Sequence, residues 1–331
     1  MRLPCIAALA LAACAPAPVA PAPAPASRLF DLRSSFWLDL HQRLYAESSA
    51  PAARQHAPPQ DGAERFTPAE RATWDAALAF YRRWLAERDF LTELTPPLVA
   101  LNDHLHHQRD PSRLDAAGLD PALAAQLTAA AAVYRAHGWP ADDRANRAWL
   151  AELAPRLAAH GEGFARALSA IYGAPWPAQP IAVEVAPYVG SVGAYTADDP
   201  PRQPLITITS ATPSYAGDAA LEQIFHEASH VLVHDLEAAI AREAAGLGRP
   251  VPDGLWHAII FFTAGELTRR AVPGYVPYAD REHLYGPRAH WDVYRAALAA
   301  HWQPFLDGAI DRRAALHRLV DAVTRALAPP A

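Results

Sequence analysis

The first half of the chain carries apolar residues at helical spacing. In the segment 69–90 the apolar side chains stand three to four residues apart, the period that one face of an amphipathic helix requires. The same period recurs at 121–137 and 148–172. We therefore predict a helical N-terminal region over residues 28–172.

The period changes to two after residue 173. Residues 181–185 alternate and are rich in β-branched side chains, and 205–209 (LITIT) alternate strictly between apolar and polar. A third short segment, 192–196 (VGAYT), also favours a strand. Glycine, proline and aspartate lie in the connections, as turns require. These segments predict a small antiparallel or mixed sheet.

Helical periodicity returns after residue 218. It predicts one helix over 219–240, a second over 255–270 and a C-terminal helical cap over 288–327. Together the patterns predict a predominantly helical α+β fold. In this fold the sheet packs on the helix 219–240, within a second region that covers residues 173–331.

The N-terminus has the features of a targeting segment. Arg2 precedes a short apolar stretch that ends in Leu11-Ala12-Ala13-Cys14. This ending resembles the lipobox of bacterial lipoproteins, and the resemblance implies that residues 1–13 are removed and that Cys14 carries a lipid. The alternative is an ordinary secretory signal that is cut near Ala15 or later.

A lipid on Cys14 would anchor the chain to a membrane. The residues that follow, 14–27, are rich in proline and alanine and predict an extended, semi-rigid tether. By similarity to the sorting rule of Gram-negative lipoproteins, the alanine after Cys14 implies the outer membrane of the bacterial envelope, with the protein facing the periplasm.

Composition narrows the classes of function. Hydrophobic residues make up 51% of the chain, so a sizeable core is expected. The net charge of -6, without a long basic run, argues against a nucleic-acid partner. Of the two cysteines, Cys5 would leave with the signal and Cys14 would carry the lipid. The mature chain would then have no thiol for catalysis, for zinc or for a disulfide.

Residues 226–230 read His-Glu-Ala-Ser-His inside the predicted helix 219–240. Four residues turn a helix through about 400°, so His226 and His230 share one face and can converge on one tetrahedral Zn²⁺. Glu227 lies about 100° further round, where it can take a proton from a water that zinc activates. The alternative is a buried helix with hydrogen-bonded histidines.

This motif resembles that of the zincin metallopeptidases, and the resemblance covers residues 181–285. It implies a Zn²⁺ cofactor and a peptide or protein substrate. In zincins the edge strand of the sheet before the motif helix holds the extended substrate by backbone pairing. On this chain the resemblance assigns that role to the segment 192–196, through Gly193, Ala194 and Tyr195, with the segment 205–209 as the alternative.

The third zinc ligand decides the subgroup. The metzincin spacing, in which a glycine and a third histidine follow the motif closely, is absent. In gluzincins a glutamate from a second helix completes the site, and this similarity points to Glu266. A lone carboxylate in the apolar segment 255–270 also favours a metal partner. Two alternatives stay open. In the first, Glu266 forms an ion pair with Arg269 or Arg270 instead. In the second, the third zinc ligand is His257.

Enzymes of this kind stabilise the oxyanion of the transition state with a tyrosine or a histidine. The segment after 255–270 contains Tyr275, Tyr278, His283 and Tyr285. We assign the role to Tyr285 and His283, with ordinary aromatic packing as the alternative.

The predicted function is that of a gluzincin-like zinc metallohydrolase, a peptidase in which Glu227 is the general base. Hydrolysis of another amide, such as a cell-wall cross-link, would use the same chemistry. The alternative from another class is an envelope lipoprotein that binds a partner or scaffolds a complex. In that case a fourth ligand, His257 or His234, closes a structural zinc site.

Overall fold

The computed structural model describes residues 28–48, 65–88, 95–189, 193–286 and 291–328. The predicted signal peptide, the tether and Cys14 lie outside these residues, as does Val192 at the start of one predicted strand.

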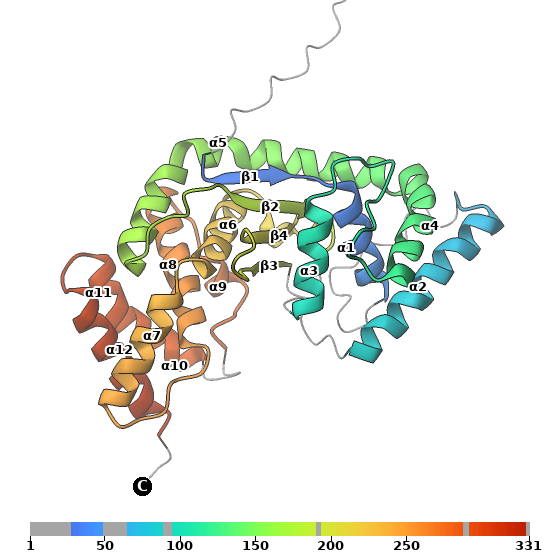
Figure 1. Cartoon of the computed structure of the whole chain (residues 1–331). Coiled ribbons are helices and arrows are strands. Elements are labelled where there is room, and N and C mark those ends of the chain that lie inside the picture. The colour runs from blue at the N-terminus through green and yellow to red at the C-terminus, as the bar shows by residue number, and fades with distance from the viewer. Residues whose placement is uncertain (1–27, 49–64, 89–94, 190–192, 287–290, 329–331) are drawn as a thin grey trace, which may run out of the picture.

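One mixed sheet of four strands lies at the centre of the molecule (Figure 1). Its spatial order is β1-β2-β4-β3, where the first three strands run parallel and β3 runs antiparallel to β4 at the edge. The strands are β1 (Phe30–Arg33), β2 (Ile181–Ala186), β3 (Ala194–Ala197) and β4 (Leu205–Thr209). The predicted α+β class and the mixed sheet are confirmed.

Strand β1 corrects the prediction that residues 28–172 are all helical. It is only four residues long, Phe-Asp-Leu-Arg, the shortest run in which apolar and polar residues can be read as alternating. It becomes a strand because its backbone pairs in parallel with β2, so that Phe30 lies opposite Ile181.

Helices α1 to α4 build a separate core on one side of the sheet (Figure 1). Their bounds are α1 (Phe36–Ser48), α2 (Pro68–Arg88), α3 (Pro96–His106) and α4 (Pro121–His137). Large aromatic side chains fill this core, among them Trp74, Tyr81 and Tyr134. The start of α4 is fixed locally, because the Asp120 side chain accepts hydrogen bonds from the first free backbone N–H groups.

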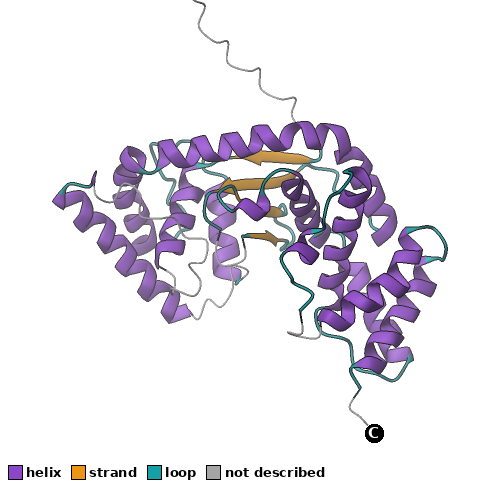
Figure 2. Cartoon of the chain, turned by 180° about the vertical axis from the view of Figure 1, so that it is seen from behind, coloured by secondary structure: helices purple, strands orange, loops and turns teal. Residues whose placement is uncertain are grey.

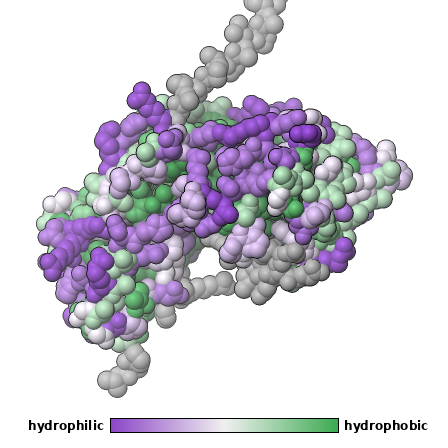
Figure 3. Space-filling view, in the orientation of Figure 1, coloured by the Kyte–Doolittle hydropathy of each residue, from purple (hydrophilic) through white to green (hydrophobic). Residues whose placement is uncertain are grey.

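Helix α5 (Trp139–Tyr172) spans the whole molecule and joins its two halves, as both views show (Figures 1 and 2). Its N-terminal part packs on α4 and its C-terminal part on α6 and β2. The helix ends at Gly173, which adopts the left-handed conformation that terminates many helices (φ 72°). Its outer side is rich in hydrophilic residues along the upper edge of the molecule (Figure 3).

The C-terminal half is helical again and packs into the same core as the sheet. It contains η3 (Pro213–Tyr215), α6 (Asp218–His230), α7 (His234–Gly246), α8 (Leu255–Ala271), α9 (Tyr278–Arg281), α10 (Trp291–Ala297), η5 (Leu298–Trp302), α11 (Gln303–Leu306) and α12 (Arg312–Ala326). None of the helices in the described residues is long and apolar enough to cross a bilayer.

The predicted helix 219–240 is in fact two helices. Helix α6 ends at His230, and α7 begins at His234. At this break the backbone N–H groups of Val231 and Leu232 bond to carbonyls three residues back instead of four. The apolar pattern continues across the break, which is why periodicity alone predicted one helix.

The two faces of the sheet differ in polarity. Val183, Ile206 and Ile208 point into the apolar core beneath α5 and α6. The alternating residues, including Glu184 and Thr207, point to the other face, where α1 and α3 cover them. The apolar face positions the candidate site, because it fixes α6 against the edge strand β3.

Candidate metal centre

Three histidines from two helices converge on one point. His226 and His230 lie one turn apart on α6, and His257 lies near the start of α8. One ring nitrogen of each lies within 4.8 Å of the other two. The Nε2 atoms of His226 and His257 are 3.3 Å apart. Two nitrogens bound to one tetrahedral zinc are also separated by about 3.3 Å, since each lies about 2.0–2.1 Å from the ion. The donor set therefore fits zinc.

Antiparallel packing of α6 and α8 explains why His257 joins the motif pair. The rings of His226 and Phe261 stack at 3.7 Å between centroids. One turn further, a Cβ on Gly265 would lie 3.3 Å from the Glu222 carboxylate, so the two helices approach each other closely there. Because α8 runs in the opposite direction to α6, its first turn lies beside His230.

The structure does not bring Glu266 to the histidines. Glu266 lies nine residues after His257 on the same helix, which places it about 13 Å further along the axis. Both of its carboxylate oxygens accept hydrogen bonds from Arg269, at 2.8 and 2.6 Å. The third imidazole comes instead from His257, and Glu266 forms the ion pair with Arg269 that the sequence left as an alternative.

Glu227 lies beside the histidines without joining them. Its Oε1 is 4.0 Å from Nε2 of His226, and its Oε2 is 4.0 Å from Nε2 of His230. The hydroxyl of Thr196, on the edge strand β3, donates to Oε2 at 2.7 Å. Burial raises the pKa of Glu227 to about 7, and the hydrogen bond from Thr196 opposes that rise. A carboxylate with such a pKa can accept and return a proton near neutral pH.

Burial also keeps the three histidines neutral. It lowers the pKa of His230 to about 3 and that of His257 to about 4, and the neighbouring His257 lowers that of His230 further. The pKa of His226 falls well below its ordinary value, first through burial and then through the two other imidazoles. Neutral imidazoles keep the nitrogen lone pair that a metal ion requires.

Aromatic rings form the wall behind the histidines. Trp256 stacks on His257 with 5.0 Å between ring centroids, and its edge faces His230 at 5.4 Å. Trp291, at the start of α10, lies 5.8 Å from His257. Trp256 and Trp291 are each half-buried. These rings exclude water from one side of the cluster and fix the orientation of the imidazoles.

The predicted substrate strand lies next to Glu227. Ala194 and Tyr195 belong to β3, and Gly193 precedes it with a φ of 80°. A Cβ on Gly193 would lie 2.9 Å from the Tyr215 ring, so the close approach also requires glycine. The phenol of Tyr195 points away from Glu227, since it accepts hydrogen bonds from α1 and α3. The backbone of β3, at the edge of the sheet, is thus the part that can pair with a substrate.

The two residues predicted to stabilise the oxyanion lie further out. The Tyr285 ring contacts Trp291 at 6.0 Å, and Trp291 in turn contacts His257. The Tyr285 hydroxyl is buried and has no hydrogen-bond partner among the described residues. His283 is exposed and has a positive φ of 55°. Their catalytic role stays a prediction.

The sequence analysis missed a buried acid one turn before His226. Glu222 is fully buried, and its carboxylate accepts hydrogen bonds from the Tyr275 hydroxyl at 2.7 Å and from the Tyr278 backbone N–H at 2.9 Å. These bonds hold the segment after α8 against α6, where the Tyr278 ring stacks on Phe261. An acidic residue four positions before a motif histidine was the available signal.

Comparison with known proteins does not assign the chain to a family. No protein-family model matches it, and neither a curated protein nor a solved structure matches it. The resemblance to zincins therefore rests on residues 226–230 and on the geometry around them.

Proposed function

We propose that this protein is a zinc-dependent metallohydrolase that cleaves peptide bonds. The observation that carries the proposal is the position of Glu227. Its two carboxylate oxygens lie 4.0 Å from the Nε2 atoms of His226 and His230, respectively, while His257 supplies a third imidazole at the same point. Packing of a buried helix alone does not require a carboxylate and three imidazoles to lie at one point.

His226, His230 and His257 would hold the ion. When bound, zinc supplies a Lewis acid that polarises a carbonyl and lowers the pKa of water. The three ligands are neutral, so they leave the positive charge of the ion largely uncompensated for this purpose. Among the described residues the cluster contains three imidazoles. His234, which a closed structural site would need as its fourth ligand, is exposed and bonds to Asp198 at 2.9 Å instead. This arrangement favours an open catalytic site over a closed structural one.

Glu227 would act as the general base. It accepts a proton as water attacks the carbonyl carbon of the scissile bond, and it then delivers that proton to the departing nitrogen. In the metal-free protein burial raises its pKa above the ordinary value, so this carboxylate accepts a proton more readily than an exposed one. Thr196 keeps the carboxylate in place during the exchange, because its hydroxyl bonds to Oε2.

The edge strand supports a peptide or protein as the substrate. β3 runs antiparallel to β4, and an extended peptide can add to its outer side through backbone hydrogen bonds. Ala194 and Tyr195 would provide these backbone groups, with Gly193 leaving space at the start of the strand. An amide of another kind, such as a cell-wall cross-link, shares the hydrolytic step and differs in how it is held.

We also propose that a lipid on Cys14 anchors the protein to the bacterial outer membrane. The proposal rests on the lipobox resemblance of residues 11–14. Expression of the full chain in a Gram-negative host, followed by detergent partitioning, tests it. The wild type should enter the detergent phase and Cys14→Ser should not; equal partitioning of both would contradict the anchor.

The decisive test separates zinc binding from hydrolysis. Glu227→Gln should retain zinc, measured by elemental analysis, and should lose peptide hydrolysis, measured with a peptide library. Glu237→Gln, at an exposed position on α7, is the matched control and should keep both. Full activity in Glu227→Gln would refute the role of the base. If neither wild type nor control cleaves any peptide although both bind zinc, the binding or scaffold function is favoured.

A further inference from the structure

A second cluster of polar groups lies between the sheet and the helices α1 and α3. Tyr195 on β3 pairs with Thr207 on β4, and Thr207 pairs with Glu184 on β2. Because paired residues point to the same side of a sheet, the three side chains form a row across three strands. Glu184 and Thr207 are both fully buried.

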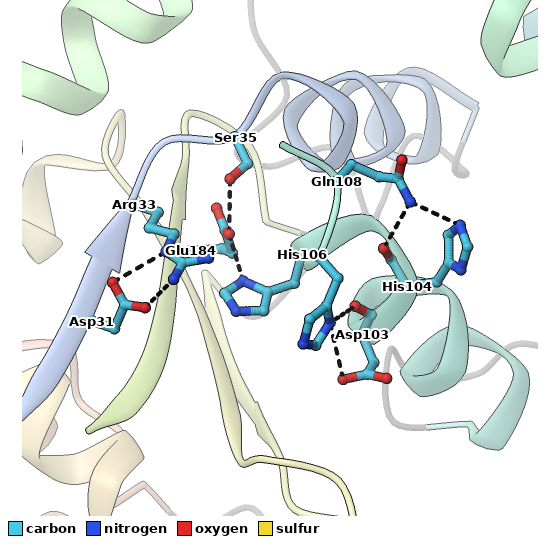
Figure 4. Close-up of polar contacts among 9 residues, drawn as sticks. Asp31, Arg33, Ser35, Asp103, His104, His106, Gln108 and Glu184 are labelled. Atoms are coloured by element: carbon cyan, nitrogen blue, oxygen red, sulfur yellow. Dashed lines mark hydrogen bonds and ion pairs between the residues drawn. The ribbon is translucent and has the colours of Figure 1, made fainter. Parts of the chain in front are cut away.

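The helices add further polar side chains to this row. Gln42 of α1 and Asn102 of α3 both donate their amide N–H to the Tyr195 hydroxyl, at 2.8 and 2.7 Å. His106, one turn after Asn102, lies with Nδ1 2.6 Å from Oε1 of Glu184, as Figure 4 shows. The row on the sheet and the two helices thus enclose one polar layer.

Five side-chain oxygens in this layer have no hydrogen-bond partner among the described residues. They all belong to residues that are at most 2% exposed. These atoms are Oδ1 of Asp39, Oε1 of Gln42, Oδ1 of Asn102, Oε2 of Glu184 and Oγ1 of Thr207. A buried polar atom without a partner is costly, and a concentration of five acceptor oxygens in one layer indicates an electropositive ligand.

The charge of the layer supports the same interpretation. Asp39 and Glu184 bring two carboxylates into a buried space. Arg33 stands beside Glu184 on β1 but donates to Asp31, as Figure 4 shows, while Arg43 on α1 donates to other carboxylates. Neither Asp39 nor Glu184 forms an ion pair with an arginine among the described residues, although Nη1 of Arg33 is buried and unpartnered on the residue that pairs with Glu184.

We propose that this layer binds one hard divalent cation, and that calcium fits it best. Two carboxylates, two amide carbonyls and a hydroxyl are the oxygen ligands that calcium uses, and it accepts six to eight of them in irregular geometry. Magnesium keeps several waters and requires near-octahedral geometry, which a layer closed by protein side chains does not favour. The site is separate from the histidine cluster and does not depend on the proposed hydrolase activity.

The ion would connect the helical N-terminal half to the sheet. Its ligands come from α1, α3, β2 and β4, and Tyr195 of the same layer directly precedes Thr196, which holds Glu227. Binding would stabilise the folded state by mass action. At a calcium concentration about 100-fold above Kd, we expect the thermal midpoint of the full chain to rise by roughly 5 °C.

Terbium luminescence and thermal unfolding test the proposal on the zinc-saturated full chain. Terbium should bind with a stoichiometry of one and emit on excitation of the aromatic side chains, of which Tyr195 lies in the same layer. Calcium should displace it and raise the thermal midpoint. Asp39→Asn and Glu184→Gln should each lose the terbium signal and the calcium response. Asp199→Asn, at an exposed position, is the matched control and should keep both.

Two results would overturn the proposal. One is the absence of any terbium or calcium response in the wild type. The other is a midpoint of Asp39→Asn that exceeds the wild-type midpoint by the same amount with and without calcium. In that case calcium does not stabilise the wild type through Asp39, and the buried carboxylates are solvated by ordered water only. If Asp39→Asn or Glu184→Gln does not fold, Thr207→Val removes one neutral ligand, and we expect it to weaken calcium affinity at least several-fold. Unchanged affinity in that variant would also contradict the site.

Discussion

The hydroxyl of Thr196 donates to the Glu227 carboxylate at 2.7 Å and lies 2.9 Å from the Glu227 backbone carbonyl. Thr196 belongs to the edge strand that would hold the substrate, and Glu227 to the helix that carries two of the histidines. This contact therefore fixes the Glu227 carboxylate relative to both the edge strand and the histidines.

Thr196→Val should lower kcat roughly 10- to 100-fold, with little change in KM. The expected size follows from the loss of one hydrogen bond to a charged group, worth about 1.5–3 kcal/mol, where about 1.4 kcal/mol corresponds to tenfold in rate. Steady-state kinetics on a cleaved peptide measure both constants. Thr196→Ser keeps the hydroxyl and should recover most of the activity.

The matched control for this prediction is Thr324→Val. Thr324 is also buried, but its hydroxyl bonds only within α12, to the carbonyls of Val320 and Asp321. Its replacement should leave kcat unchanged. A loss of activity in Thr324→Val as large as in Thr196→Val would show that both act through stability.

His257→Ala should lose zinc, whereas Glu266→Gln should keep it. His257 has its Nε2 3.3 Å from that of His226, while Glu266 is bound to Arg269. Loss of a residue that hydrogen-bonds to a metal ligand lowers metal affinity roughly 10- to 100-fold. Loss of a ligand itself should lower zinc affinity by more than that. Competition with a chromogenic chelator measures the affinity. Loss of zinc in Glu266→Gln but not in His257→Ala would restore the gluzincin-like ligand set.

Stability should fall as pH rises through neutrality, because of Glu222. Burial raises its pKa to about 7, from an ordinary value of 4.5. Between these values the folded chain binds more protons than the unfolded chain, so the free energy of unfolding decreases with pH. That decrease is complete only above about pH 8 and amounts to on the order of 3 kcal/mol.

Urea unfolding of the metal-free protein at pH 5 and pH 8 measures the effect. The wild type should lose more stability between these values than Glu222→Gln, which has no proton to release. Glu227 contributes in the same direction in both proteins, so their difference isolates Glu222. Identical pH dependence in the two proteins would contradict the raised pKa of Glu222.

Tyr285→Phe should separate catalysis from stability. The Tyr285 hydroxyl is buried without a hydrogen-bond partner among the described residues, so its removal should leave the stability unchanged or raise it by about 1 kcal/mol. If the hydroxyl stabilises the oxyanion, kcat should fall at least about 10-fold in the same variant. Thermal unfolding and steady-state kinetics, measured on one preparation of the variant, distinguish an effect on stability from an effect on catalysis. Unchanged kcat would leave Tyr285 as a packing residue beside Trp291.

The pair of histidines on one helix face and the main elements could be predicted from local sequence. His226 and His230 share a face because of helix geometry alone, and the alternation of 205–209 correctly predicted β4. Patterns of this kind are local, since the pitch of a helix and the pleat of a strand repeat within a few residues. The same locality explains why the break between α6 and α7, which lies within a continuous apolar pattern, was missed.

The sequence by itself determined the helix that carries His226, Glu227 and His230, the predominantly helical α+β class and the strands β2 and β4. Only the tertiary structure decided that His257, and not Glu266, lies beside that pair. The physical reason is the direction in which α8 packs on α6: both residues lie on one apolar helix, and antiparallel packing puts the first turn of that helix beside the motif. No local sequence pattern encodes this direction of packing. The direction depends on how apolar faces that are distant in the sequence come together.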